Sequence, residues 1–458
     1  MIMIGSGVAG PRSTDRARPG SHRVRRASAA DSARVCAQVF APIVAQGVIL
    51  RRPRLLDLAA HRDSARRGNA LLTRLRDEYG PDPLAVSAFG RRVVLPLTAQ
   101  DAREVLGRSP DPFTPANREK VAALGHFEPG AVLVTRDARQ RAARRRFNET
   151  VLETPHAAHH LSGVFLDVVR QEVAALLAEP GALCDWDGFH ARFLRIVRRI
   201  VLGDGAADDT ALTKQLDALR ADANWGFAHR RRTGIHDRFT TRLGAHLTRA
   251  EPGSLAAPAA FADHREGIDP LGQVPHWLFA YDAAAIAAFN TLTLLAAHPE
   301  HAERARDEQA FRDVEDPAGI AEASHLRACV LESLRLWPTT LVILRDATRR
   351  DSLAPEGAAV AVVSSFFHRD ARTLDFADRF APDVWLDGRA DPARGIVPFS
   401  AGPAACPGRN LVLFTVTALL DTVLRRTTNL DLAVPGLLDP GRPLPHTWNH
   451  TAARLLTA

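Results

Sequence analysis

The feature that most constrains the fold is a stretch of 23 residues, 276–298, that carries one acid, Asp282, and neither Lys nor Arg. Apolar residues occupy every face of a helix drawn through it, so no side of that helix suits water. No run in the chain reaches the roughly 18 consecutive apolar residues of a membrane span. We therefore expect this helix to run through the centre of a large helical protein.

Apolar residues at helical spacing predict further helices on both sides of this segment. They cover residues 138–152, 167–179, 189–203, 233–250, 301–311, 321–337 and 407–426. Between residues 83 and 96, two apolar runs rich in β-branched residues flank Phe89-Gly90, which predicts a hairpin. Two short strand-like runs follow, at 341–350 and 358–367. The expected fold is mainly α with a small β-rich region.

The composition agrees with one large folded unit. The 458 residues are 46% hydrophobic and 24% charged, which is enough for a sizeable core and excludes disordered and disulfide-scaffold classes. Residues 1–35 show little periodicity, and we expect a mobile arm followed by a single domain over 36–458. The arm holds Gly5-x-Gly7-x-x-Gly10, but no helix-forming sequence follows, so a dinucleotide site is not predicted.

Charge and cysteine usage exclude several other classes. The formal charge of +7 comes from 59 basic residues of which only Lys120 and Lys214 are lysines, so the basic pI partly reflects a coding bias towards Arg. No nucleic-acid module accompanies the arginine runs. The four cysteines lie far apart without a CxxC pair, and no signal-peptide layout is present, which fits a soluble protein in a reducing cytoplasm. The histidines of PHAAHH, residues 155–160, are read as a surface cluster rather than a metal site.

The most specific motif is FxxGxxxCxG, formed by Phe399, Gly402, Cys406 and Gly408 immediately before a predicted helix. Glycines allow a tight turn, and a helix N-terminus places partial positive charge beside a thiolate. A lone cysteine is more often a buried apolar residue. A second motif makes this interpretation less favoured for Cys406. The segment ESLRLWP places Glu332 and Arg335 on one helical face, and Glu332 lies 74 residues before Cys406.

Together these motifs resemble the cytochrome P-450 family, from about residue 50 to the end of the chain. The resemblance implies a helical domain around haem b, with Cys406 as the thiolate ligand of the iron and Phe399, Gly402 and Gly408 shaping its loop. It also implies that Glu332 and Arg335 pair in the interior. In this chain the third charge of the family's Glu-Arg-Arg arrangement falls on Val384, so the pair must find other partners.

The resemblance further implies cations that hold the haem propionates. Arg345 occupies one such position, and Arg141 and Arg145 lie where the family usually has His and Arg four residues apart. The basic residue two before the cysteine is replaced by Ala404, and His126 or the arginines of 138–152 are candidates to compensate.

On the central helix, the family carries an acid followed by an alcohol that assist oxygen activation. The acid is kept as Asp282, and the alcohol is replaced by Ala283, with Phe279 and Ile286 on the expected wall above the haem. Asp282 is a candidate for proton relay or, alternatively, a buried acid with no such role. Thr291 and Thr293 lie over two turns further along, too far to supply the hydroxyl.

The leading hypothesis is therefore a soluble bacterial-type monooxygenase that oxidises an organic small molecule in secondary metabolism. Electrons would come from a separate ferredoxin and ferredoxin reductase docking on a basic face, with neither nucleic acid nor membrane as partner. One alternative, suggested by Ala283, is a family member that needs no reductant-driven dioxygen activation, through peroxide use, N–O cleavage, dehydration or nitrene transfer. Another is a noncatalytic relative that serves as a partner protein. The loops 112–131 and 225–236 would set the substrate, which the sequence does not identify.

Overall fold

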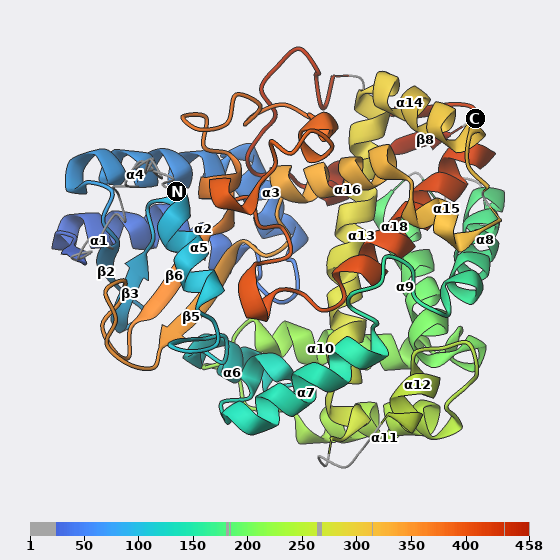
Figure 1. Cartoon of the computed structure of the whole chain (residues 1–458), viewed down its shortest axis with the longest axis horizontal. Coiled ribbons are helices and arrows are strands. Elements are labelled where there is room, and N and C mark those ends of the chain that lie inside the picture. The colour runs from blue at the N-terminus through green and yellow to red at the C-terminus, as the bar shows by residue number, and fades with distance from the viewer. Residues whose placement is uncertain are drawn as a thin grey trace, which may run out of the picture.

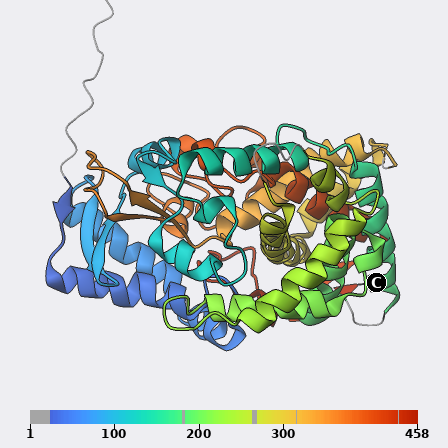
Figure 2. The ribbon, with the colours of Figure 1, turned by 90° about the horizontal axis from the view of Figure 1, so that it is seen from below.

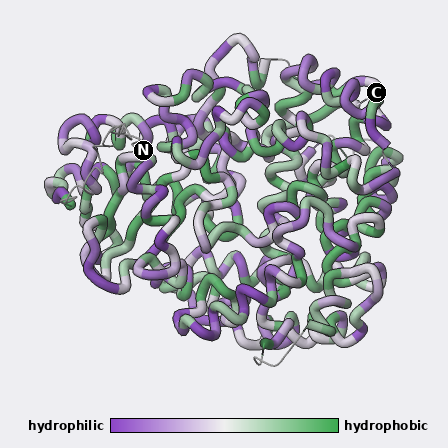
Figure 3. The backbone as a smooth tube through the Cα atoms, viewed as in Figure 1, coloured by the Kyte–Doolittle hydropathy of each residue, from purple (hydrophilic) through white to green (hydrophobic). Residues whose placement is uncertain are grey.

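The structure is a computed structural model that describes residues 24–179, 183, 185–262, 268–313, 315–434 and 436–457. Figure 1 shows a β-sheet with the N-terminal helices at one side and a larger helical region at the other, and Figure 2 shows that the molecule is flat. Hydrophobic segments lie mostly in the interior and hydrophilic ones along the outer turns (Figure 3). The mainly helical fold with a small β-rich region is as predicted from the sequence.

The α-helices in the described residues are α1 (Ala29–Val35), α2 (Ala41–Ala45), α3 (Pro53–His61), α4 (Ser64–Tyr79), α5 (Ala99–Gly107), α6 (Arg118–Leu124), α7 (Ala138–Val151), α8 (Ser162–Ala178), α9 (Trp186–Leu202), α10 (Thr210–Ala223), α11 (Thr233–Arg249), α12 (Ala256–Phe261), α13 (Val274–Ala297), α14 (Pro299–Ala310), α15 (Pro317–Ala321), α16 (Ser324–Leu336), α17 (Ser364–His368) and α18 (Arg409–Arg426). The strands there are β1 (Arg25–Arg26), β2 (Leu84–Ala88), β3 (Arg91–Leu95), β4 (Phe113–Thr114), β5 (Val342–Ala347), β6 (Ala359–Val363), β7 (Leu430–Leu432) and β8 (Leu455–Thr457).

The larger sheet has the order β1-β2-β3-β6-β5-β4, and β7 pairs with β8 separately. The predicted hairpin is present as β2 and β3, with Phe89 and Gly90 both at positive φ in the turn. Along β5 the burial alternates, so Arg345 points to the same interior side as Ile343 and Ala347. Strand β5 thereby places Arg345 in the protein interior.

Part of the predicted N-terminal arm, residues 24–35, is structured. Residues 1–23 lie outside the described residues, but β1 pairs with β2, and α1 follows directly. The Ser28 hydroxyl caps α1 by accepting from the Asp31 N–H, and the Asp31 carboxylate accepts from the hydroxyl of Tyr79 on α4. These contacts explain why a polar sequence without clear periodicity is structured: a capped helix is anchored by hydrogen bonds to distant parts of the chain.

Helix α13 runs through the protein as expected, and it packs against α9, α16 and α18. It includes the apolar stretch that is long enough to cross a membrane, but 78% of that stretch is buried inside the protein. Four positions near its N-terminal half are only partly buried: His276, Phe279, Ala280 and Ala283. Their spacing of i, i+3, i+4 and i+7 places them on one face. Phe279 packs against Phe127 and His276 bonds to Glu128, but this face is less completely covered than the rest of the helix.

Candidate functional site

Cys406 lies in the short loop between a 3-10 turn, Gly402–Ala404, and the start of α18. The Cys406 N–H donates to the Phe399 carbonyl at 3.0 Å, which closes the loop. Gly402 has a φ of 67°, and a Cβ there would lie 2.3 Å from the backbone oxygen of Leu106 on α5. Only glycine fits this position, which is how the loop approaches α5 so closely.

The need for glycine at Gly408 is weaker than the sequence suggested. Its φ is −87°, and an added Cβ would meet only Leu152 at an ordinary 3.8 Å. The tight turn expected from two glycines is therefore required by the backbone only at Gly402.

The environment of the Cys406 sulfur both opposes and favours its charge. Burial raises the pKa of the thiol, while the Gly408 N–H and the guanidinium groups of Arg145 and Arg409 act to lower it. The Arg409 guanidinium also lies 5.9 Å from the centre of the Phe399 ring. A buried thiol with nearby donors suits a thiolate once a cation is bound to the sulfur.

Helix α7 and the segment after it hold the loop in place. Arg145 donates to the Ala405 carbonyl at 2.6 Å and pairs with Glu149 at 2.6 Å. The Thr154 hydroxyl donates to the Pro407 carbonyl at 2.8 Å. The sequence predicts Arg145 as a cation that binds a propionate. In the structure its guanidinium instead donates to the loop carbonyl of Ala405 and to the carboxylate of Glu149.

Glu332 and Arg335 lie on α16, and both side chains are fully buried. They form two parallel hydrogen bonds of 2.7 and 2.8 Å. The remaining Arg335 donors reach four backbone carbonyls in the irregular segment before the thiolate loop: His368, Phe376, Ala377 and Arg379. The arginine therefore fixes the path of that segment.

The charge missing at Val384 is replaced by neutral donors. The indole N–H of Trp385 donates to Glu332 Oε2 at 2.9 Å, and the Ala381 N–H donates to Oε1 at 2.9 Å. Val384 itself is buried in a small apolar cluster. Each carboxylate oxygen thus accepts two hydrogen bonds, which removes the expected cost of a half-satisfied buried pair.

Arg345 is 3% exposed, and no carboxylate among the described residues lies within ion-pair distance of it. Its guanidinium donates to the Ser109 hydroxyl at 2.8 Å, to the Leu344 carbonyl at 2.9 Å and to the Ser400 hydroxyl at 3.4 Å. Burial lowers its pKa to about 10, so it remains a cation at neutral pH. A second cation, Lys120 of α6, donates to the same Leu344 carbonyl at 3.0 Å.

The pair of Arg345 and Lys120 is a buried concentration of positive charge. Burial and the nearby Arg345 both lower the pKa of Lys120. Asp346 and Glu119 act in the opposite direction on the pKa of Lys120, but neither forms an ion pair with Lys120 or Arg345 in the described part of the chain. A group with carboxylates placed here would satisfy both cations.

The other predicted propionate partners are less clearly placed. Arg141 of α7 is half-buried and forms no ion pair within the described part of the chain. His126 is 2% exposed; its Nε2 lies 3.4 Å from the Gly226 carbonyl, and its Nδ1 has no partner. Both remain predictions.

Asp282 is held in a buried ion-pair network beside the partly exposed stripe of α13, with Arg220 of that network 5.2 Å from the centre of the Phe279 ring. Its carboxylate pairs with Arg220 of α10 at 2.5 Å and with His190 of α9 at 2.8 Å. Burial opposes the charge, but Arg220 and His190 outweigh it and hold the pKa of Asp282 well below its usual range. The acid is therefore ionised and fixed between helices α9, α10 and α13.

Ala283 follows on the partly exposed face and offers no polar atom. The Thr291 hydroxyl donates to the Ala287 carbonyl at 2.7 Å and lies 3.0 Å from the Ser333 hydroxyl, and the Thr293 hydroxyl donates to the Phe289 carbonyl. Both hydroxyls serve the helix itself, in agreement with the expectation that neither replaces the missing alcohol.

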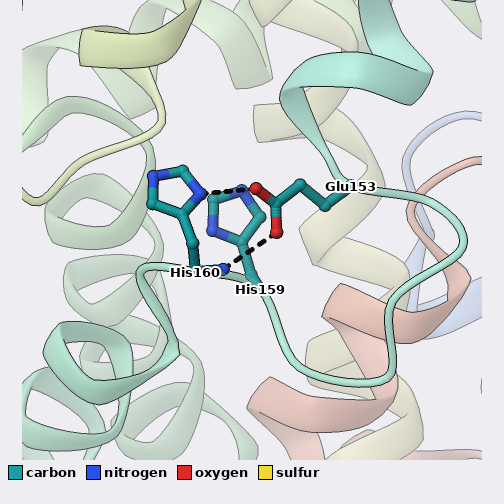
Figure 4. A group of neighbouring side chains, drawn as sticks. All are labelled: Glu153, His159 and His160. Atoms are coloured by element: carbon teal, nitrogen blue, oxygen red, sulfur yellow. Dashed lines mark hydrogen bonds and ion pairs between the residues drawn. The ribbon is translucent and has the colours of Figure 1, made fainter.

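Near the loop, Glu153, His159 and His160 come together (Figure 4). The Glu153 carboxylate accepts from the His160 backbone N–H at 2.9 Å and lies 2.5 Å from the His160 ring. Both ring nitrogens of His159 are already used, by the Val151 carbonyl and the Leu161 N–H. His159 therefore has no free ligand atom, and the cluster reads as a hydrogen-bonded turn before α8.

These observations test whether haem fits. Arg345 donates to Ser400 of the Cys406 loop, and α18, which begins just after that loop, packs against α13. Arg345 and Lys120 form no ion pair among the described residues, so two propionates would supply the missing anions. The donor set, one soft sulfur ligand and buried cations, matches a haem-thiolate group.

Residues 277–429 match a protein-family model described as Cytochrome P450. The fold resembles the retinoic acid-bound cyanobacterial CYP120A1 at a TM-score of 0.68 and 14% identity, over 84% of this chain and 94% of that one. It also resembles a zebra fish cytochrome P450 solved with progesterone, at a TM-score of 0.66 and 18% identity over 85% and 99% of the two chains. The chain thus resembles the cytochrome P450 family in sequence over residues 277–429 and has the fold of these two proteins over most of its length.

Curated cytochrome P450 relatives agree over shorter spans. Cytochrome P450 4c3 of Drosophila melanogaster is 32% identical over 36% of this chain and 32% of its own length. The chain covers about a third of the length of the first such relatives. The cyclooctat-9-en-7-ol 5-monooxygenase of Streptomyces melanosporofaciens is 27% identical over 62% of this chain and 69% of its own length.

The sequence analysis did not predict several residues of the candidate site. Lys120 carried a signal, because it is one of only two lysines in a chain with 59 basic residues. The partners of Asp282, His190 and Arg220, lie 92 and 62 residues away and carried none. Trp385 directly follows Val384 in the sequence, but its role depends on the direction of its indole N–H, which the sequence does not encode.

Proposed function

We propose that this protein is a cytochrome P450, a haem-thiolate monooxygenase that oxidises an organic small molecule. The observation that carries the proposal is that the loop of Cys406 lies next to the buried cation Arg345, which reaches Ser400 of that loop, while α18, which begins just after Cys406, packs against α13. When bound, haem b would supply an iron centre that activates dioxygen and inserts one oxygen atom into the substrate.

The chain's own residues would act in three ways. Cys406 would bind the iron, with the Gly408 N–H stabilising the thiolate charge. Arg345 and Lys120 would each bind a propionate, and Arg141 is a further candidate, whereas Arg145 would hold the loop through the Ala405 carbonyl. The pair of Glu332 and Arg335, completed by Trp385, would keep the segment before the loop in one position.

Protons would have to reach the site without a hydroxyl at position 283. Asp282 is ionised and hydrogen-bonded to His190, so it would take part by exchanging a proton with His190 or with water entering beside it. We keep Asp282 as the relay candidate on this basis. The alternative chemistry without reductant-driven dioxygen activation rests on Ala283 alone and has no support among the named relatives, one of which is a monooxygenase.

Electrons would come from a separate ferredoxin and its reductase. Exposed arginines of α7 and α18, such as Arg139 and Arg409, lie on elements that flank the thiolate loop and would attract an acidic partner. A role in secondary metabolism is supported only by the Streptomyces relative, which by its name acts on cyclooctat-9-en-7-ol. The cytoplasmic location stays a prediction.

Two measurements test the proposal. The reduced protein with carbon monoxide should show the absorption band of a thiolate-ligated haem, and absence of that band would refute it, as expected for a noncatalytic relative. Incubation of a metabolite panel with reduced ferredoxin under ¹⁸O₂ should then yield a product with one labelled oxygen atom. Product that forms without reductant would favour the alternative chemistry instead.

A further inference from the structure

A small cavity lies beside α13, beyond its partly exposed stripe. Its volume is about 70 Å³, which is room for a few water molecules or one small polar group. Much of its wall is apolar, with Leu56, Ile286, Leu341 and Val363 contributed by four separate segments. The wall also holds many polar residues, several of which, such as Asn69, Ser365 and His446, are hydrogen-bonded to one another. The polar groups that lack such partners are therefore the informative ones.

Arg51 is the only cation of fixed charge among the residues that line this cavity. Its two η nitrogens each donate one hydrogen bond, to the Gly47 carbonyl at 2.8 Å and the Thr339 carbonyl at 2.7 Å. No carboxylate in the described part of the chain lies within ion-pair distance of Arg51. Burial lowers its pKa to about 10, partly offset by Asp282, and it remains charged at neutral pH.

The acid that influences Arg51 is already committed elsewhere. Asp282 pairs with Arg220 and His190, and it does not line the cavity. His450, which does line it, has a pKa lowered to about 3 by burial and by Arg51, so it is neutral. The positive charge of Arg51 therefore faces the cavity without a counterion from the chain.

Two further polar groups in the wall lack partners. Asn290 is 2% exposed, and its Oδ1 atom has no hydrogen-bond partner. The indole Nε1 of Trp448 is also buried and without a partner. An amide can turn its NH₂ group towards the cavity, so both side chains can act as donors to a ligand oxygen. Buried polar groups left unpaired in this way point to a ligand or to ordered water.

We propose that this cavity binds the carboxylate of an apolar small-molecule substrate, with Arg51 as the charged anchor and Asn290 and Trp448 as additional donors. The proposal rests on the function proposed above, because it names the substrate class of the same enzyme. Asn290, Ile286 and Ala283 lie on one side of α13, and seven residues separate Asn290 from Ala283. The carboxylate would thus bind about 10 Å along the helix from Ala283, so oxidation would occur several carbons away from it.

The test measures binding by calorimetry, which does not depend on turnover. Haem-loaded protein is titrated with straight-chain carboxylic acids of graded length and with their methyl esters, which keep the apolar chain and remove the charge. We expect at least one acid to bind about tenfold or more tightly than its ester, as a charge-assisted hydrogen bond to Arg51 would provide. A series with no acid preference would overturn the proposal, and so would binding of neither compound.

Matched variants then assign the preference to Arg51. Arg51→Met should reduce the acid preference to about threefold or less while ester binding is kept, and Arg51→Lys should retain part of it. Arg54→Met is the control, because Arg54 is exposed and does not line the cavity. If Arg51→Met retains the full preference, the carboxylate site is wrong. The carbon monoxide spectrum of each variant shows independently whether the haem-thiolate proposal stands.

Discussion

The two sides of the proposed haem space depart from the family pattern in different ways. On the thiolate side, the charge missing at Val384 is replaced by the Trp385 indole, and Lys120 stands near Arg345 where Ala404 offers no cation. On the α13 side, Ala283 lacks a hydroxyl, and no described side chain takes its place. The difference follows from energetics: an unsatisfied buried charge destabilises the fold, whereas an alanine in a helix destabilises nothing. The missing charge on the thiolate side must therefore be replaced for the protein to be stable. The missing hydroxyl at Ala283 affects only the delivery of protons to the site.

The largest expected effect is on the thiolate side, from replacing the ligand itself. Cys406→Ala should abolish the thiolate band in the carbon monoxide difference spectrum, because no other sulfur lies in the loop. Cys36→Ala is the matched control, since the Cys36 side chain contacts the Ser87 carbonyl, far from the loop. A band that survives in Cys406→Ala would show that the iron is bound elsewhere.

The next largest effect tests how much the pair of Glu332 and Arg335, and the Trp385 indole that completes it, contribute to the free energy of unfolding. Glu332→Gln should destabilise the protein by about 3–5 kcal/mol, because Arg335 would be left as a buried charge without its partner. Trp385→Phe should cost less, about 1–3 kcal/mol, because one carboxylate oxygen loses one of two donors. Urea unfolding of the haem-loaded protein measures both. Equal stability of Trp385→Phe and wild type would contradict the role assigned to the indole.

The parts of the fold that the sequence predicts are those whose stability comes from local pattern. Long helices such as α13 and α18 were predicted to within a few residues, because their apolar periodicity is strong. Short elements such as β1 and α1 were missed, because their stability comes from pairing with β2 and from the contacts of Asp31 rather than from local pattern. The loop motif located Cys406, but the replacement donors depend on side-chain direction, which no spacing encodes.

On the α13 side, Asp282→Asn tests whether the acid is a fixed ionic partner. The variant should lose about 2 kcal/mol at neutral pH, because Arg220 retains only Asp217 as an acidic partner. The folded-state pKa of Asp282 lies below its unfolded value, so its stabilising effect is present above about pH 4 and is lost as the pH falls. The stability difference from wild type should therefore begin to shrink below about pH 5 and continue to shrink as the pH falls towards the folded-state pKa.

Asp217→Asn is the control for that measurement, because the pKa of Asp217 is raised in the folded state whereas that of Asp282 is lowered. Burial, opposed by Arg220, raises the pKa of Asp217, so its charge is unfavourable in the folded state at neutral pH. Removing that charge should leave the stability at pH 7 unchanged or slightly higher. A loss at pH 7 as large as that of Asp282→Asn would mean that Asp217, not Asp282, holds Arg220.

The smallest effect tests whether the α13 side lacks only a hydroxyl. Ala283 is partly exposed, so the two extra atoms of a threonine can be accommodated. Ala283→Thr should lower the peroxide released per electron pair by a few-fold, because a positioned hydroxyl assists proton delivery. Ala283→Val has the same shape without the hydroxyl and should not improve coupling. If both variants behave alike, the change reflects volume rather than hydrogen bonding. If neither differs from wild type, protons already reach the site by another route, and the network of Asp282 and His190 becomes the first place to look for it.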